Sequence, residues 1–181
     1  MPITNNEVLL KYSNSAATAG SQSGAYNHLG GYMSTTQVAS NSLNNLFTDI
    51  TGVENANSQI DYRCIFIHNS NVTLTLLNTI AYISAEVEGA TIIALAADTI
   101  GAVPITQTSP QATVTYNTLS APGSLIFTSP VTYSDTAHPA IVLGNIPAGY
   151  CVALWVKRSA GNTTAINNDG FQLRVQGDTA A

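Results

Sequence analysis

Charged residues are scarce in this chain. Asp, Glu, Lys and Arg make up 8% of its 181 residues, whereas about 25% is usual for a soluble domain. Catalytic sites and metal cages are built largely from charged residues and histidine, and the chain has ten acids, five bases and three histidines in all. We therefore expect a protein that acts through the shape of its surface, with no enzymatic activity and no cofactor.

Basic residues are the scarcest of the charged ones. Five Lys and Arg against ten acids give a net charge of −5. Affinity for nucleic acid grows with the number of phosphates neutralised, and anionic lipid also attracts basic clusters. The composition therefore predicts neither a nucleic-acid partner nor a membrane partner.

Long apolar runs and a secretory pattern are also missing. The longest apolar stretch, residues 90–97, is interrupted by Thr91 and is too short to span a bilayer. The first residues lack a basic region followed by an apolar one. We expect synthesis and assembly in a cytoplasm.

Cysteine occurs twice, as Cys64 and Cys151, each inside an apolar, strand-like run. Without a secretory signal, two buried free thiols are expected. A disulfide between two packed sheets is the alternative.

What the chain does contain is a series of strand-like segments. In residues 61–69, alternation places Cys64 and Phe66 on one face and Ile65 and Ile67 on the other. Further strand-like runs occur at 74–83, 91–97, 113–116, 124–127, 140–143, 150–156 and 171–175. Their number and spacing predict an all-β domain over residues 36–181, a β-sandwich or jelly roll.

Several large side chains in these segments are candidates for the core. We expect the core to include Leu43, Leu46, Tyr62, Phe66, Trp155 and Phe171. One short helix candidate, residues 42–47, has apolar side chains at helical spacing, although a strand or an irregular turn fits equally well.

Residues 1–35 differ from the rest of the chain. Residues 8–12 could form a short strand, but residues 13–31 are rich in Ser, Ala, Gly and Asn and show almost no apolar periodicity. We predict an extended Gly/Ser-rich N-terminal arm that becomes ordered against a neighbouring subunit. The candidate partner-binding residues on this arm are Tyr12, Tyr26, His28 and Tyr32.

Local patterns for catalysis or metal binding are weak. His28, His68 and His138 show none of the spacings typical of metal sites. Ser134 and Asp135, close to His138, have the residue types of a hydrolase triad, but triad members normally come from separate elements. We interpret this segment as a surface turn.

Three further polar groups have ordinary explanations. Glu86 and Glu88 are better explained as a solvated loop than as a glycosidase pair, and residues 167–170 as a polar turn rather than a calcium loop. Lys157 and Arg158 end a strand and could form a small basic patch with other arginines, although a solvated strand end is the simpler interpretation.

Three segments carry a resemblance to virion proteins of tailed bacteriophages. They are Ser40–Asn69, Ile146–Arg158 and Asn167–Thr179, and their order and spacing agree with that group. In the group, Leu-Phe-Asp-Asp-Val precedes a turn, after which Tyr-Arg-Cys opens an apolar strand. This chain departs from the pattern at Thr48-Asp49, where the group has two aspartates.

The resemblance implies a capsid-decorating, or cement, protein. Such proteins are commonly β-sandwiches with an extended arm. They lie on the capsid exterior as homotrimers or dimers and bridge neighbouring subunits of the major capsid protein. The alternative is a tail-fibre or receptor-binding module for host glycans, which predicts clustered exposed aromatic residues. A capsule depolymerase is a third class, which the small number of acids disfavours.

Overall fold

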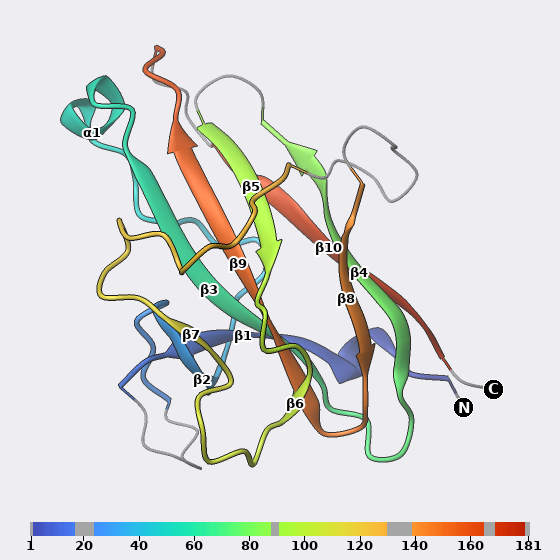
Figure 1. Ribbon diagram of the computed structural model, residues 1–181. Coiled ribbons are helices and arrows are strands. Elements are labelled where there is room, and N and C mark those ends of the chain that lie inside the picture. The colour runs from blue at the N-terminus through green and yellow to red at the C-terminus, as the bar shows by residue number, and fades with distance from the viewer. Residues whose placement is uncertain (1, 17–23, 88–90, 130–138, 165–168, 180–181) are drawn as a thin grey trace.

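The computed structural model describes residues 2–16, 24–87, 91–129, 139–164 and 169–179 and is nearly all-β (Figure 1). The strands are β1 (Val8–Asn14), β2 (Gly30–Gln37), β3 (Ile60–Asn69), β4 (Leu76–Glu86), β5 (Thr91–Ala97), β6 (Val103–Pro104), β7 (Ala112–Val114), β8 (Ile141–Ile146), β9 (Tyr150–Ala160) and β10 (Phe171–Thr179). The helical elements are a 3-10 turn, η1 (Asn5–Glu7), and α1 (Gly52–Ala56). The predicted all-β class is confirmed. None of the described helices is long and apolar enough to cross a membrane.

The strands form two antiparallel sheets. The larger sheet has the order β5-β9-β3-β1-β2-β7, with β6 also paired to β9, and the smaller sheet has the order β10-β4-β8. The long strands β3 and β9 pair over most of their length, from Ile60 opposite Ser159 to His68 opposite Cys151. The arrangement is consistent with a β-sandwich-like fold.

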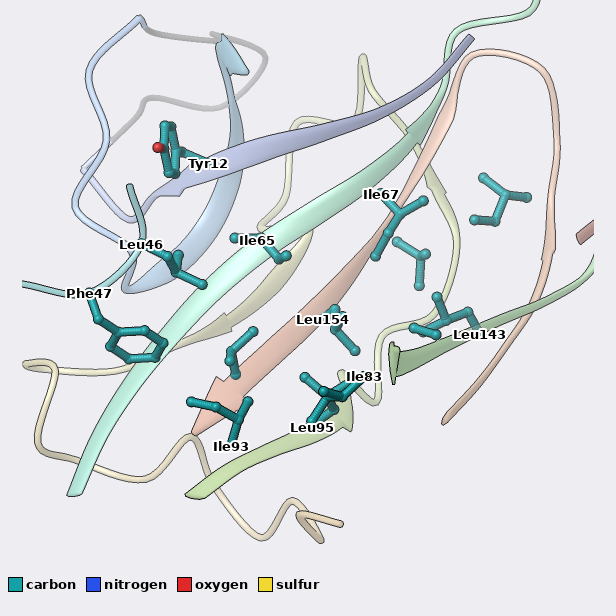
Figure 2. Packing of buried hydrophobic residues seen from close by; sticks show 14 of the residues in the cluster. Tyr12, Leu46, Phe47, Ile65, Ile67, Ile83, Ile93, Leu95, Leu143 and Leu154 are labelled. Atoms are coloured by element: carbon teal, nitrogen blue, oxygen red, sulfur yellow. The ribbon is translucent and has the colours of Figure 1, made fainter. Parts of the chain in front are cut away.

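The larger sheet buries apolar side chains on both of its faces. Ile65 and Ile67 of β3 point into a first core, which also contains residues of the smaller sheet such as Ile83 and Leu143 (Figure 2). The alternate residues of β3 point into a second core, together with Met33 of β2 and Trp155 of β9. The alternation predicted for β3 is therefore confirmed, and it occurs because each face of this strand has its own apolar layer.

Of the six expected core residues, three are buried and two are partly buried. Leu46, Phe66 and Trp155 are buried, and Tyr62 and Phe171 are partly buried against the second and first cores respectively. Leu43 is the exception: its side chain is 78% exposed, so its predicted place in the core was wrong.

The helix candidate at residues 42–47 forms turns instead. Asn41 and Asn44 adopt left-handed backbone conformations, with φ of 56° and 55°, and these interrupt a helix. The short helix α1 begins later, after Thr51. A capping box closes its first turn, since Thr51 N donates to Glu54 Oε2 at 2.7 Å and Glu54 N donates to Thr51 Oγ1 at 3.3 Å.

The N-terminal segment differs from the predicted arm. β1 is an internal strand of the larger sheet, paired with β3 from Val8 opposite Asn69 to Tyr12 opposite Ile65, and also with β2. The expected boundary at residue 35 falls inside β2. Small polar side chains such as Ser13 are fully buried here, so the segment packs tightly without an apolar alternation that sequence reasoning could detect. Residues 17–23 of the expected arm lie outside the described residues.

Candidate functional surface

Three of the four predicted partner-binding residues lie together. The rings of Tyr12 and Tyr26 stack with centroids 4.2 Å apart, and His28 lies 5.1 Å and 5.2 Å from the two tyrosine rings. Tyr12 is buried and its hydroxyl donates to the carbonyl of Asn45 at 2.5 Å, whereas Tyr26 is 47% exposed. The cluster therefore exposes Tyr26 to solvent, and its ring is stacked on the buried ring of Tyr12.

Backbone hydrogen bonds fix the segment that carries Tyr26 and His28. Asn27 N and His28 N both donate to the carbonyl of Ser13, and His28 in turn accepts from Cys64 N at 2.8 Å. Asn27 also exchanges side-chain hydrogen bonds with Ser15. Residues 27–28 thus lie beside β3 at Cys64, next to the point where the pairing of β1 with β3 ends.

Burial changes the protonation of this cluster. Desolvation, aided by the nearby positive charge of Arg63, lowers the pKa of His28 to about 4. Burial and the neighbouring Tyr26 raise the pKa of Tyr12. At neutral pH Tyr12 and His28 are therefore uncharged, and an aromatic surface of this kind suits stacking or apolar contact.

Tyr32, the fourth predicted residue, lies elsewhere. It belongs to β2, opposite Asn14, and its hydroxyl donates to the carbonyl of Thr108 at 3.2 Å. It therefore joins β2 to a loop of its own chain and is not part of the aromatic cluster.

A second feature is an exposed segment, residues 114–126, which sequence reasoning missed. Four of its apolar side chains are exposed: Val114 by 50%, Tyr116 by 99%, Leu119 by 55% and Ile126 by 82%. The segment adjoins the aromatic cluster, because Thr115 N donates to the carbonyl of Leu29 at 3.1 Å. We call the two neighbouring segments, residues 24–29 and 114–126, the apolar surface.

In residues 113–116 the polar side chains face inward and the apolar ones face outward, which is the reverse of the usual pattern. Thr115 is buried, and Thr113 N donates to Oδ2 of the buried Asp98 at 2.8 Å. The same carboxylate oxygen accepts from Trp155 Nε1 at 2.9 Å. The threonines therefore face inward toward polar partners, and Val114 and Tyr116 face outward.

The three arginines are divided between two places. Arg158 forms an ion pair with Asp61 at 2.7 Å and lies over the ring of Phe47, as does Arg63. Arg174 is on β10, in the smaller sheet. The expected solvated strand end at Arg158 is therefore wrong: Arg158 is buried, and Arg63 lies beside it over the same ring, whereas Arg174 does not join them.

The remaining candidates do not form a site among the described residues. Glu86 accepts a hydrogen bond from Ile93 N at 2.9 Å, which gives its carboxylate a structural partner. His68 is buried on β3, and burial together with the nearby Lys11 lowers its pKa. Residues 88, 134, 135, 138 and 167–168 lie outside the described part. Within that part, no group of His, Cys, Asp and Glu could hold a metal ion.

The two cysteines are free and buried. Burial raises the pKa of Cys151 to about 12 and also raises the pKa of Cys64. The expectation of two buried free thiols is confirmed, and both thiols are poor nucleophiles because the thiolate is the reactive form.

No protein-family model, no curated protein and no solved structure matches this chain.

Proposed function

We propose that the protein is a structural component of a tailed-bacteriophage virion that decorates the capsid exterior and stabilises it by bridging neighbouring major capsid subunits. The proposal begins from the resemblance in the three segments described above. Two of them supply β3 and β9, which are hydrogen-bonded neighbours in the larger sheet. The segments that resemble phage virion proteins therefore include the two long strands, β3 and β9, that contribute side chains to both cores.

The observation that carries the proposal is the apolar surface. A cement protein needs adhesive area, and residues 114–126 present apolar side chains to solvent. This segment is hydrogen-bonded through Thr115 N to the carbonyl of Leu29, three residues after the half-exposed Tyr26. Exposed apolar groups gathered in one region are typical of interaction sites. A tyrosine that is 99% exposed, as Tyr116 is, gains a large contact area when a partner covers it.

The repeated geometry of a shell suits weak contacts of this kind. A homotrimer or dimer offers the same surface two or three times, and binding through several copies raises the overall affinity without new types of contact. The acidic balance of the chain, with a net charge of −5, suits a position away from the packaged DNA.

A binding assay on capsid shells tests the proposal. Shells stripped of the protein are incubated with the purified chain and sedimented, and their melting temperature is measured. We expect saturable binding and a higher melting temperature. We expect the double variant Tyr116→Ser with Ile126→Ser to bind at least about tenfold more weakly, since aromatic anchors contribute about 2 kcal/mol or more.

A matched control uses Val72→Ser with Val142→Ser, which alters two apolar residues that are 88% and 71% exposed and lie outside the apolar surface. This control variant is expected to bind as the parent chain does. The proposal is wrong if the parent chain ignores the shells. Equal binding by both double variants would remove the role of the apolar surface.

The aromatic cluster favours one alternative, a tail-fibre or receptor-binding module. Sugars stack on exposed aromatic rings, and Tyr26 lies flat against Tyr12 with an interplanar angle of 21°. This function predicts that the chain pellets with host cells or binds immobilised host glycan, and that Tyr26→Ala abolishes that binding.

A further inference from the structure

The smaller sheet ends in an open strand edge. β10 is the outer strand in the order β10-β4-β8, and it runs for nine residues, Phe171–Thr179. The hydrogen bonds that its residues make within the described part go to β4, apart from the one that Thr179 Oγ1 accepts from Ile3 N. An unpaired edge of this length is a template for pairing with another strand.

The other strand edges are less suitable. β7 has three residues. β5 is bridged at Leu95 by Thr128, and the ladder of β8 with β4 contains two register shifts close to Gly144, whose φ is +77°. In contrast, the extra residues at the two irregularities of the β4–β10 ladder lie on β4, so β10 itself is regular.

The side chains of β10 alternate between an exposed outer face and a partly buried inner face. Gln172, Arg174, Gln176 and Asp178 are exposed on the outer face. On the inner face, Phe171, Leu173 and Val175 pack against the first core but remain only partly buried. A strand added to this edge would cover more of that apolar row.

The charges on β10 fit a second copy of the same strand. When two identical strands pair antiparallel with Gln176 opposite itself, Arg174 of each copy lies opposite Asp178 of the other. Opposite charges in directly facing positions stabilise a sheet, and like charges in those positions destabilise it. The side chain of Arg174 is exposed and makes no hydrogen bond or ion pair with any other described residue, so its guanidinium can make this contact.

We propose that the chain forms a two-fold symmetric dimer through its β10 strands, centred on Gln176, so that the two smaller sheets join into one. The contact is isologous and self-complementary, as a two-fold axis requires. It uses a different part of the surface from residues 24–29 and 114–126, and it does not depend on the proposed virion role.

Charge reversal tests the contact. Sedimentation equilibrium of the full chain is expected to show a dimer. Arg174→Asp places two acids opposite each other in both symmetric pairs, and we expect it to weaken dimerisation at least about tenfold. Asp178→Arg is expected to do the same, whereas the double variant with both changes restores the opposite-charge pairs and the dimer. Lys157→Asp, which changes the net charge equally on β9, is the matched control and is expected to dimerise normally.

Cross-linking tests the register. In an antiparallel pair, facing Cα atoms are about 4.5–5.5 Å apart, which is within the range of about 4.4–6.8 Å that a disulfide spans. Gln176→Cys is therefore expected to cross-link two chains under mild oxidation, and Gln172→Cys, on the same face but away from the axis, is expected not to. The native thiols are buried and free in this structure and do not compete.

The proposal fails if the parent chain is monomeric at concentrations of about 100 μM, a value at which even weak specific dimers with micromolar Kd are populated. It also fails if a dimer or trimer is insensitive to Arg174→Asp, or if the double variant does not recover. Equal cross-linking at positions 172 and 176 would overturn the proposed register.

Discussion

The hydrogen bonds of the buried Asp98 carboxylate join Trp155, in the second core, to Thr113 and Ile100. Replacing Asp98 therefore tests how much these bonds stabilise the fold. Asp98 is 5% exposed. Its Oδ2 accepts from Trp155 Nε1 at 2.9 Å and from Thr113 N at 2.8 Å, and its Oδ1 accepts from Ile100 N at 3.0 Å. One side chain thus joins β9, β7 and the turn after β5.

Replacement by alanine removes every one of these acceptors. Trp155 is fully buried and Thr113 is partly buried, so two N–H groups lose their partners in places that water reaches poorly. A buried donor without an acceptor costs about 1–3 kcal/mol. We therefore expect Asp98→Ala to lower the free energy of unfolding by about 2–6 kcal/mol.

Replacement by asparagine has a smaller expected effect. The amide oxygen can take the place of Oδ2 and keep both Trp155 and Thr113, while the amide nitrogen then faces Ile100 N. Because the residue Ile100 is 41% exposed, water can replace that lost acceptor. We expect Asp98→Asn to cost about 1 kcal/mol, or about 2–4 °C in Tm for a chain of this size.

Urea unfolding followed by tryptophan fluorescence measures both variants. Trp155 is the only tryptophan in the chain, and it is 0% exposed, so its emission shifts to longer wavelength when the second core opens. Asp49→Ala, which removes an exposed acid, is the control and is expected to change stability by less than about 0.5 kcal/mol. If Asp98→Ala costs less than Asp98→Asn, or if both match the control, the reasoning from unmet donors is refuted.

Three further predictions use the same unfolding assay. Because the folded-state pKa of His28 is about 4, below the ordinary value of 6.5, its contribution to stability is full above pH 6.5 and is lost as the pH falls toward 4. His28→Gln should therefore flatten the dependence of the unfolding free energy on pH in that window. An unchanged dependence would contradict the lowered pKa of His28. Gly30→Ala should be much more destabilising than Gly101→Ala: both have positive φ, but a Cβ on Gly30 would lie 1.8 Å from a backbone oxygen of β7, whereas one on Gly101 meets open space. Leu46→Ala should cost about 2–5 kcal/mol and Leu43→Ala almost nothing, since the two are 7% and 78% exposed.

The parts of the fold that sequence predicts well are those that bury apolar side chains at a period of two. β3 is the best case, since Ile65 and Cys64 belong to different cores and each face keeps its own pattern. β1 was predicted only in part, as a possible short strand over residues 8–12, and β2 was missed. Their place in the sheet depends on backbone pairing and on small buried polar residues such as Ser13 and Ser34, which carry no apolar periodicity.

The candidate surface was only partly predictable. The grouping of Tyr12, Tyr26 and His28 as partner-binding residues followed from their segment, and the structure brings their rings together. The exposure of Tyr116 could not be predicted, because it depends on Asp98 holding the threonine face of residues 113–116 inward. In contrast, Thr51 and Glu54 have the spacing of a capping box, and this signal could have located α1.

The order of strands in the two sheets has a consequence for the timing of folding during synthesis. β3 pairs on one side with β9, β5 also pairs with β9, and β4 pairs with β8 and β10. A nascent chain emerges N-terminus first, so β3 can pair with β1 at once, whereas its other neighbour, β9, and the named partners of β4 and β5 are translated later. Completion of the two sheets therefore waits for the last strands: β5 and one edge of β3 stay without their neighbour until β9 has been translated, and β4 stays without its outer neighbour until β10 has been translated.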